Sequence, residues 1–316
     1  MPEAERTPMK KTNRYLKWLI KHTASLEGKN VVITGANSGL GFAAAAHLLS
    51  LGARLMLACR NEARADAAAA TLREAYPTGE IFTETLDLAS FASIDAFAEK
   101  MRQRGEKIDV LLHSAGVYYP REQVTEDGHP MTVGVNYIGT ARLTEALLPL
   151  MDENGRVVFT TSLVDRFGKP EIPTDGGKKE GYAHYAQSKH LLSAYVLRRA
   201  RERKAGEPAF IAVHPGITAT SLLDPAKTSH HPLFSRIGHA FLFVFTHKRK
   251  KRLSPPCLPR QATPKTAIAS AHAVCLASAA IRTKPVSAVA CGNWRKRNKT
   301  KSSCDGRRVL FTLYII

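Results

Sequence analysis

The sequence predicts an α/β protein with a doubly wound parallel sheet of the Rossmann type and helices on both faces. From about residue 29 onward, short β-branched runs alternate with longer helical patterns, which is the order of βαβ units. Three glycines follow the first of these runs, at the turn into a helical pattern. In addition, 44% of the 316 residues are apolar, so the chain can bury a substantial core.

Six short runs rich in β-branched and apolar residues are the expected strands. They are residues 30–34, 54–58, 81–86, 108–113, 156–161 and 209–214. The stretches between them show helical patterns. They are residues 40–51, 62–76, 91–104, 131–151 and 182–204. A last helix near 263–280 and a seventh strand near 286–290 would continue the alternation.

The net charge of +19 belongs mainly to the C-terminal end of the chain. Residues 246–316 hold 16 Lys and Arg residues and one acidic residue, whereas residues 1–245 are close to balanced. The basic clusters 248–252 and 295–301 have almost no aromatic residues among them, so they predict no base-stacking platform and no specific nucleic-acid partner. They are better interpreted as a solvated tail or as a nonspecific contact with an anionic membrane surface.

The cysteines and the N-terminus bear on the compartment. The five cysteines form no C-x-x-C pair, so we expect no metal site and no disulfide framework. Residues 1–28 are basic and amphipathic, without the apolar core of a secretory signal or the length of a membrane span. We expect them either to lie on an anionic membrane surface or to pack on the domain as a short leading helix. The expected location is cytoplasmic or peripherally membrane-associated, and not secreted.

The sequence TGANSGLG at 34–41 stands between the first expected strand and the first expected helix. Glycines allow a tight turn and a close approach to a pyrophosphate, which the free N–H groups at a helix start then bind. A plain structural turn is the alternative. The candidate cofactor-binding residues in this turn are Gly35, Asn37, Ser38, Gly39, Leu40 and Gly41.

Arg60 stands at the end of the second expected strand. An acidic residue at this point selects the free 2′-hydroxyl of NAD, whereas a positive residue accommodates the 2′-phosphate of NADP. The sequence therefore predicts NADP(H) as the cofactor, with a simple surface arginine as the alternative.

Tyr185 and Lys189 are four residues apart in an expected helix, so they share one face. A nearby cation favours the phenolate and lowers the tyrosine pKa from its usual value of ~10. Such a tyrosine can donate a proton to a carbonyl during hydride transfer, or accept one from an alcohol. A Tyr/Lys pair of this spacing also occurs by chance.

Two further polar residues strengthen the interpretation of this pair. Ser162 ends the fifth expected strand, at the edge where open α/β sheets bind ligands. Its hydroxyl either bonds the reacting oxygen or satisfies its own turn. Asn136 is a polar residue in an otherwise apolar helical stretch. Its amide either bonds backbone in the core or orients a water that relays protons to Lys189.

In this combination the residues resemble the short-chain dehydrogenase/reductase family. The resemblance runs from about residue 29 to 222 and continues more weakly to about 280. The matching motifs, in order, are the glycine turn 34–41, Asp87-Leu88, His113-Ser114-Ala115-Gly116, Asn136, Ser162, Tyr185 with Lys189, and Pro215-Gly216.

The resemblance implies roles for the four polar residues. Tyr185 would be the catalytic acid/base, and Lys189 would lower its pKa and bind the nicotinamide ribose. Ser162 would position the substrate oxygen, and Asn136 would complete the proton relay. Further cofactor contacts that the resemblance implies are Asp87 and Leu88 at the adenine, Ser114, Ala115 and Gly116 after the fourth strand, and Pro215, Gly216 and Thr220 at the nicotinamide.

Within the family, the strings ANSGLG (36–41), LACR (57–60) and HPG (214–216) look most like the retinol-dehydrogenase-like branch, which includes the WW-domain oxidoreductase. This resemblance implies hydride transfer between NADP(H) and an apolar carbonyl or alcohol of the retinoid, steroid or lipid-derived aldehyde class. A non-catalytic NADP(H)-binding scaffold of the same fold is the alternative. One oxidoreductase domain is expected over 29–290, with a substrate lid at 222–260 and a basic tail at 291–316.

The sequence departs from the family pattern after the fourth expected strand. The usual Asn-Asn-Ala-Gly is replaced by His113-Ser114-Ala115-Gly116. We expect the loss of the asparagine side chains to weaken a structural hydrogen-bond network more than the chemistry.

Overall fold

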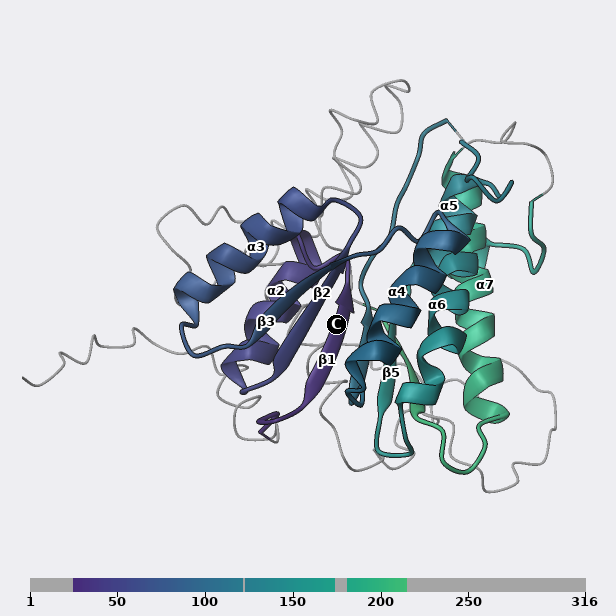
Figure 1. Ribbon diagram of the computed structural model, residues 1–316. Coiled ribbons are helices and arrows are strands. Elements are labelled where there is room, and N and C mark those ends of the chain that lie inside the picture. Colours follow the sequence, from purple (N-terminus) through teal and green to yellow (C-terminus); the bar gives the residue numbers. More distant parts are fainter. Residues whose placement is uncertain (1–24, 122, 174–180, 215–316) are drawn as a thin grey trace, which may run out of the picture.

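The computed structural model describes residues 25–121, 123–173 and 181–214, and its strands form one parallel sheet (Figure 1). The spatial order is β3-β2-β1-β4-β5-β6. The strands are β1 (Asn30–Thr34), β2 (Arg54–Cys59), β3 (Ile81–Thr85), β4 (Val110–His113), β5 (Arg156–Thr160) and β6 (Ala209–Val213). The order reverses at β1, which is where open α/β sheets bind ligands. The predicted doubly wound fold is confirmed.

Helices cover both faces of the sheet (Figure 1). On one face lie α2 (Gly39–Ser50) and α3 (Glu62–Ala75), and on the other lie α4 (Phe91–Arg104), α6 (Thr140–Leu147) and α7 (Gly181–Arg201). Successive side chains of a strand point to opposite faces. Accordingly, Val31 and Ile33 of β1 pack in the core with α2 and α3, while Val32 packs in the core with α4, α6 and α7.

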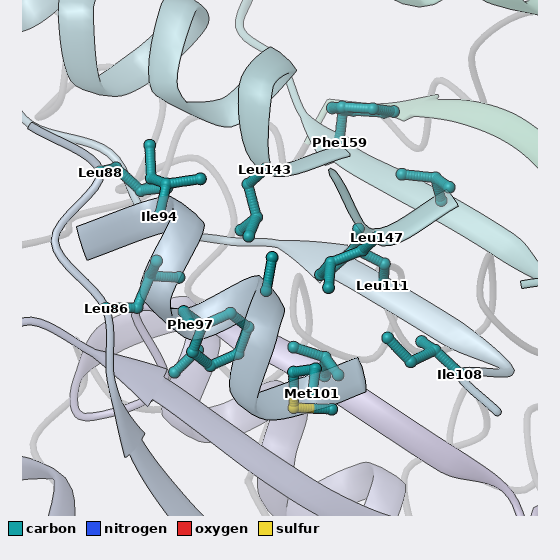
Figure 2. Close-up of a cluster of buried hydrophobic side chains, with 14 of the residues drawn as sticks. Leu86, Leu88, Ile94, Phe97, Met101, Ile108, Leu111, Leu143, Leu147 and Phe159 are labelled. Carbon is teal, nitrogen blue, oxygen red and sulfur yellow. The ribbon is translucent and has the colours of Figure 1, made fainter. Parts of the chain in front are cut away.

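Figure 2 shows the core cluster that α4, α6 and α7 cover. Phe97 from α4, Leu143 from α6 and Phe159 from β5 are all almost completely buried there. Burying one such side chain contributes about 1.5–3 kcal/mol. The side chain of Leu88, in the loop between β3 and α4, also packs in this cluster. That loop is therefore anchored to the core.

The starts of α3 and α4 are set by polar caps. The Asn61 side chain accepts a hydrogen bond from the backbone N–H of Arg64 at 2.9 Å, and Ser90 accepts one from Ser93 at 3.4 Å. Gly105 ends α4 with a φ of 65°, a left-handed conformation that glycine adopts without strain. The strands and these two helices begin and end within two residues of the predicted bounds.

The single helix predicted over 131–151 is wrong. The chain forms four consecutive pieces, namely α5 (Met131–Val133), the π-helix η1 (Gly134–Gly139), α6, and the 3-10 helix η2 (Leu148–Leu150). At Gly139 a Cβ would lie 2.1 Å from the Leu88 carbonyl oxygen, and the Thr140 hydroxyl donates to the Val135 carbonyl at 3.0 Å. The helix therefore widens into a π turn where its backbone packs directly against the loop after β3. Pro149, which has no N–H, lies in the 3-10 turn.

Several predictions lie outside the described residues. They are most of the N-terminal segment 1–28, the nicotinamide contacts Pro215, Gly216 and Thr220, the lid at 222–260, the helix at 263–280, the strand at 286–290 and the tail at 291–316. Across the described ranges, no helix combines the length and the apolar character that crossing a bilayer requires.

Candidate active site

The candidate site residues gather at one edge of the sheet. Thr34 at the end of β1 is in register with His113 at the end of β4, and His113 is in register with Phe159 of β5. The glycine turn, the segment 114–117 and Ser162 follow these three strand ends. They therefore meet at the carboxyl edge, beside the reversal of the strand order.

The glycine turn is packed too closely to accept side chains. Gly35 has a φ of 67°, and a Cβ there would lie 2.8 Å from the Ala115 Cα. A Cβ on Gly41 would lie 2.4 Å from the Gly35 carbonyl oxygen. The glycines hold the turn against the segment after β4 and against the first turn of α2.

The N-terminus of α2 fits a diphosphate. Ser38 precedes the helix in an extended conformation, and its side chain makes no capping hydrogen bond. Ser38 and Gly39 are exposed, and no heavy atom lies within 4 Å of the place where a Gly39 Cβ would be. The Ser38 side chain therefore leaves the first N–H groups of α2 uncapped, and the helix dipole adds partial positive charge there. Asn37 and Leu40, also predicted here, are half-buried in the same turn.

Cys59 lies beneath this turn as a buried free thiol. Burial raises the pKa of the thiol, and hydrogen bonds from the backbone N–H groups of Asn37, Ala36 and Gly35 oppose that rise. The thiol is thus a neutral support for the turn, a contact that the motif search did not predict.

Arg60 follows β2 and is exposed. The backbone N–H of Gly35 donates to the carbonyl of Ala58 at 3.0 Å, so the glycine turn adjoins this end of β2. Among the described residues Arg60 forms no ion pair. Its guanidinium is therefore available to a phosphate, and it would hold one as a charge-assisted donor.

The loop after β3 presents backbone, not the Leu88 side chain, to a ligand. Leu88 packs in the core, as Figure 2 shows. The Asp87 carboxylate accepts a hydrogen bond from the Ala89 N–H at 2.9 Å, and the Ser93 hydroxyl accepts one from the Asp87 N–H at 2.9 Å. Any contact of this loop with an adenine is therefore made by its backbone and by the Asp87 carboxylate.

His113, which stands where the family pattern has asparagine, makes a buried hydrogen bond of its own. Its Nε2 is paired with the Thr144 hydroxyl at 2.9 Å, and its ring stacks on Phe159. Burial lowers the pKa of His113 to about 3, so the imidazole is neutral. His113 Nδ1 and the hydroxyl of Ser114 are buried and have no partner among the described residues. The expected weakening of this network stays a prediction.

Asn136 uses its whole amide to join three segments. Its Oδ1 accepts from the Val117 N–H at 2.8 Å, and its Nδ2 donates to the Val117 carbonyl at 3.0 Å and to the Ser188 hydroxyl at 3.1 Å. Ser188 in turn donates to the Tyr185 carbonyl at 2.8 Å. The first of the two alternatives for Asn136, an amide bonded to backbone in the core, describes this structure. The proton relay remains a prediction.

Lys189 is a buried cation, with 4% of its surface exposed. Its Nζ donates to the Thr160 carbonyl at 2.9 Å. Burial lowers the pKa of Lys189 to about 8. The nearest heavy atoms to a Cβ built on Gly116 are Asn136 Oδ1 at 3.5 Å and Lys189 Nζ at 3.8 Å. Gly116 therefore leaves the space in front of the ammonium and the amide open.

Tyr185 is half-buried on α7, near the ammonium and beside a second aromatic ring. Lys189 Nζ lies 5.9 Å from its ring centroid, and the Tyr118 ring lies edge-on at 6.0 Å. Burial raises the pKa of Tyr185, and a hydrogen bond with the Ser162 side chain acts in the opposite direction. The net shift is upward. The lowering predicted from Lys189 is not found in this arrangement, because burial is the largest cause of the shift and the group that opposes it is Ser162.

Sequence reasoning missed the backbone partners of the site. The Thr160 carbonyl and both polar groups of the Val117 backbone hold the predicted side chains, and backbone groups carry no signature in a sequence. Ser188 was detectable in principle, since it lies three residues after Tyr185 and therefore on nearly the same helix face. No cluster of three or more His, Cys, Asp or Glu side chains suited to a metal ion occurs in the described parts of the chain.

Comparisons with known proteins agree with this geometry. The family model described as short chain dehydrogenase matches residues 29–230. The chain is 37% identical to mouse retinol dehydrogenase 14 over 226 residues, covering 67% of this chain and 66% of that protein. It is 36% identical to the human retinol dehydrogenase 14, covering 68% of this chain and 70% of that protein. The chain thus spans about two thirds of the length of these relatives.

Solved structures share the fold. An uncharacterized protein from Mycobacterium paratuberculosis superimposes with a TM-score of 0.55 at 29% identity, over 68% of this chain and 78% of that one. The six-stranded parallel sheet is therefore matched by experiment in a related sequence.

Proposed function

The chain belongs to the short chain dehydrogenase family, and we propose that it is an NADP(H)-dependent oxidoreductase that acts on apolar carbonyls and alcohols. One observation supports this most strongly. The Tyr185 phenol is hydrogen-bonded with the Ser162 side chain, and Lys189 Nζ lies 5.9 Å from its ring centroid. The Tyr185 backbone carbonyl is linked through the Ser188 hydroxyl to the Asn136 amide. This group stands at the sheet edge that adjoins the glycine turn, so an acid/base lies next to a site that fits a dinucleotide.

In the reduction direction, Tyr185 donates its phenolic proton to the substrate oxygen while the Ser162 hydroxyl holds that oxygen. When bound, NADPH supplies the hydride. The Lys189 ammonium stabilises the phenolate that remains, because it lies near the ring and is shielded from water. The raised pKa of Tyr185 keeps the phenol protonated at neutral pH.

The choice of NADP(H) rests on Arg60. Its exposed guanidinium at the end of β2 has no acidic partner among the described residues. A 2′-phosphate on the adenosine ribose would supply that partner, whereas the 2′-hydroxyl of NAD would leave the arginine uncompensated.

The substrate class rests on the relatives. Two of them are named retinol dehydrogenase, and retinol is a long apolar alcohol. We extend this to retinoid, steroid and lipid-derived carbonyls for the present chain. A cytoplasmic or peripherally membrane-associated location would suit substrates that partition into lipid.

The test is an assay of the full chain for nicotinamide oxidation with retinal, steroid ketones and short aldehydes, run in parallel with NADPH and NADH. We expect turnover with the long apolar substrates, and faster turnover with NADPH. NADPH binding without hydride transfer to any of these substrates would instead favour the non-catalytic scaffold. Equal rates with NADH would contradict the role given to Arg60.

A further inference from the structure

The 3-10 helix η3 (Leu163–Phe167) begins directly at Ser162. Ser162 is extended, and its hydroxyl makes no capping bond to η3. The Asp165 N–H donates to the Ser162 carbonyl at 3.1 Å, and the Gly168 N–H donates to the Asp165 carbonyl at 3.0 Å. The position of the Ser162 hydroxyl therefore depends on where the backbone of η3 lies.

Asp165 fastens η3 to the helix that carries Tyr185. Its Oδ2 accepts a hydrogen bond from the Ser193 hydroxyl at 2.8 Å. Its carbonyl oxygen pairs with His190 Nδ1 at 2.9 Å. Both partners belong to α7, and Ser193 lies two helical turns beyond Tyr185. One residue of η3 thus holds α7 through a side chain and a carbonyl.

Gly168, directly after η3, also contacts α7, and it does so through its backbone alone. A Cβ on Gly168 would lie 2.5 Å from the Ala186 carbonyl oxygen and 2.5 Å from His190 Cβ. The backbone at Gly168 therefore rests directly on α7, one residue after Tyr185. Together, the Asp165 bonds and the Gly168 contact leave η3 little freedom to slide along the helix.

We propose that Asp165 is a positioning residue, which sets the place of the Ser162 hydroxyl against the Tyr185 phenol by holding η3 on α7 through Ser193 and His190. This inference rests on the proposed function for its consequence in turnover. Its structural part, the control of Tyr185 through Ser162, has a readout of its own.

That readout is the ionisation of Tyr185. The hydrogen bond with Ser162 lowers the pKa of the phenol against the larger upward effect of burial. If η3 shifts, this bond lengthens or breaks, and the pKa of Tyr185 rises further. The other titratable or charged groups near the phenol on these elements are Tyr182, His184, Lys189 and His190 on α7, Asp165 and Arg166 on η3, Tyr137 on η1 and Tyr118 after β4. Asp165→Ala also removes a carboxylate, whose loss by itself would lower the pKa of Tyr185, whereas Ser193→Ala breaks the same bond and leaves every charge in place.

The experiment compares Asp165→Ala, Asp165→Asn and Ser193→Ala in the full chain. Tyrosinate formation is followed by ultraviolet difference spectroscopy against pH, with Tyr185→Phe subtracted to isolate one phenol. We expect Asp165→Ala and Ser193→Ala to raise the pKa of Tyr185 and to lower kcat by roughly threefold to tenfold, the worth of one hydrogen bond. NADPH affinity stays unchanged. Asp165→Asn, whose amide oxygen still accepts from Ser193, restores most of the wild-type titration.

A matched control is available on the opposite side of the sheet. Asp66 accepts a hydrogen bond from the Thr83 hydroxyl, also at 2.8 Å. Asp66→Ala removes the same kind of hydroxyl–carboxylate bond far from η3, and we expect it to leave the Tyr185 titration as it is. Asp165→Ala combined with Ser193→Ala is expected to shift the titration no further than either change alone, since both remove one bond.

An unchanged Tyr185 titration in folded Asp165→Ala and Ser193→Ala, or an equal shift in Asp66→Ala, would overturn the proposal. If Asp165→Ala does not fold, Ser193→Ala and Asp165→Asn decide the question. A wild-type chain that transfers no hydride would contradict the proposed function alone, because the titration needs no turnover. Turnover that depends on Tyr185, with no response to Asp165, would contradict this inference alone.

Discussion

The two halves of the sheet treat buried polar groups in opposite ways. In the half formed by β1, β2 and β3, Thr34 is the one polar side chain that the described structure buries completely. The half formed by β4, β5 and β6, with its helices and loops, buries many. They are His113, Thr125, Thr132, Asn136, Thr140, Thr144, Thr161, His184, Gln187, Ser188 and Lys189.

Under the proposed function, this difference separates cofactor binding from proton transfer. The first half offers a ligand the backbone N–H groups of the glycine turn, which need no polar side chain in the apolar core. The second half holds acid, base and amide groups out of water, where each must find a partner or lower the stability of the fold. Lys189 and His113 show the cost, because burial shifts the pKa of both toward the neutral form. The variants below test the division.

The largest effect is expected for Tyr185→Phe. Removal of the phenolic hydroxyl takes away the proton donor, so kcat should fall by about 10²–10⁴-fold. NADPH affinity, which the glycine turn supplies, should be unchanged. Steady-state rates and a fluorescence titration of NADPH measure the two quantities. Tyr182→Phe, an exposed tyrosine three residues earlier on the same helix, is the control. Full activity in Tyr185→Phe would refute the assigned mechanism.

Lys189→Met tests the cost of the buried ammonium. The folded-state pKa of about 8 lies below the usual 10.5, so the unfolded chain binds more protons between these values. The free energy of unfolding of the wild type should therefore rise as the pH increases from about 8 to above 10. Lys189→Met should not show that rise. Its free energy of unfolding at neutral pH should exceed that of the wild type by about 2 kcal/mol, despite the lost bond to Thr160, and it should lose turnover. Denaturant titrations at several pH values measure this.

Lys107 provides a control of opposite sign. A hydrogen bond with Asp152 raises the pKa of this exposed lysine. Any stability it provides is present at neutral pH and disappears at high pH, so Lys107→Met should keep the alkaline rise. Loss of the rise in this variant as well would show that the effect does not belong to Lys189.

Arg60→Ala tests the binding half. Loss of a charge-assisted bond to a 2′-phosphate should weaken NADPH binding by about 10-fold to 100-fold and leave NADH binding almost the same. Dissociation constants for both nucleotides show the change in their ratio. Arg64→Ala, another exposed arginine four residues further along the chain, should leave the ratio intact. A ratio that survives Arg60→Ala would place the selectivity elsewhere.

The smallest effect is expected for His113→Asn. The pKa of about 3 for His113 in the fold, against 6.5 in the unfolded chain, means that stability falls as the pH falls below 6.5. Between pH 7 and about pH 5.5 this residue should lower the free energy of unfolding of the wild type by about 1 kcal/mol. His113→Asn should not show this part of the decrease. Thermal unfolding in matched buffers would record it. His129→Asn, on a loop outside the sheet, serves for comparison.

The strands, α3 and α4 were predictable because their signals are local. Short β-branched and apolar runs, a capping Asn61 or Ser90 and a terminal Gly105 act within a few residues of where they occur in the sequence. The same holds for the Tyr185 and Lys189 pair, whose spacing places both on one helix face.

Features that depend on contacts across the fold were not predictable. The π-helix at Gly134–Gly139 accommodates the close contact between Gly139 and the carbonyl of Leu88, which lies some fifty residues earlier in the sequence. The pairing of His113 with Thr144 needs α6 to lie beside β4. The rise in the pKa of Tyr185 depends on burial, which the one-dimensional pattern does not measure. The hydrogen bonds of Asp165 with Ser193 and His190 likewise form only when η3 and α7 are packed together.

The π turn also makes the number of residues between Gly134 and Gly139 important for the contacts of this segment. Each residue of a helix advances the next by about 100° around the axis. Deleting one residue between Gly134 and Gly139 would yield a more regular coil, yet it would rotate either the Asn136 amide away from Val117 or the bare Gly139 surface away from Leu88. The irregular winding lets one short segment contact the loop after β3 through Gly139 and both Val117 and Ser188 through Asn136.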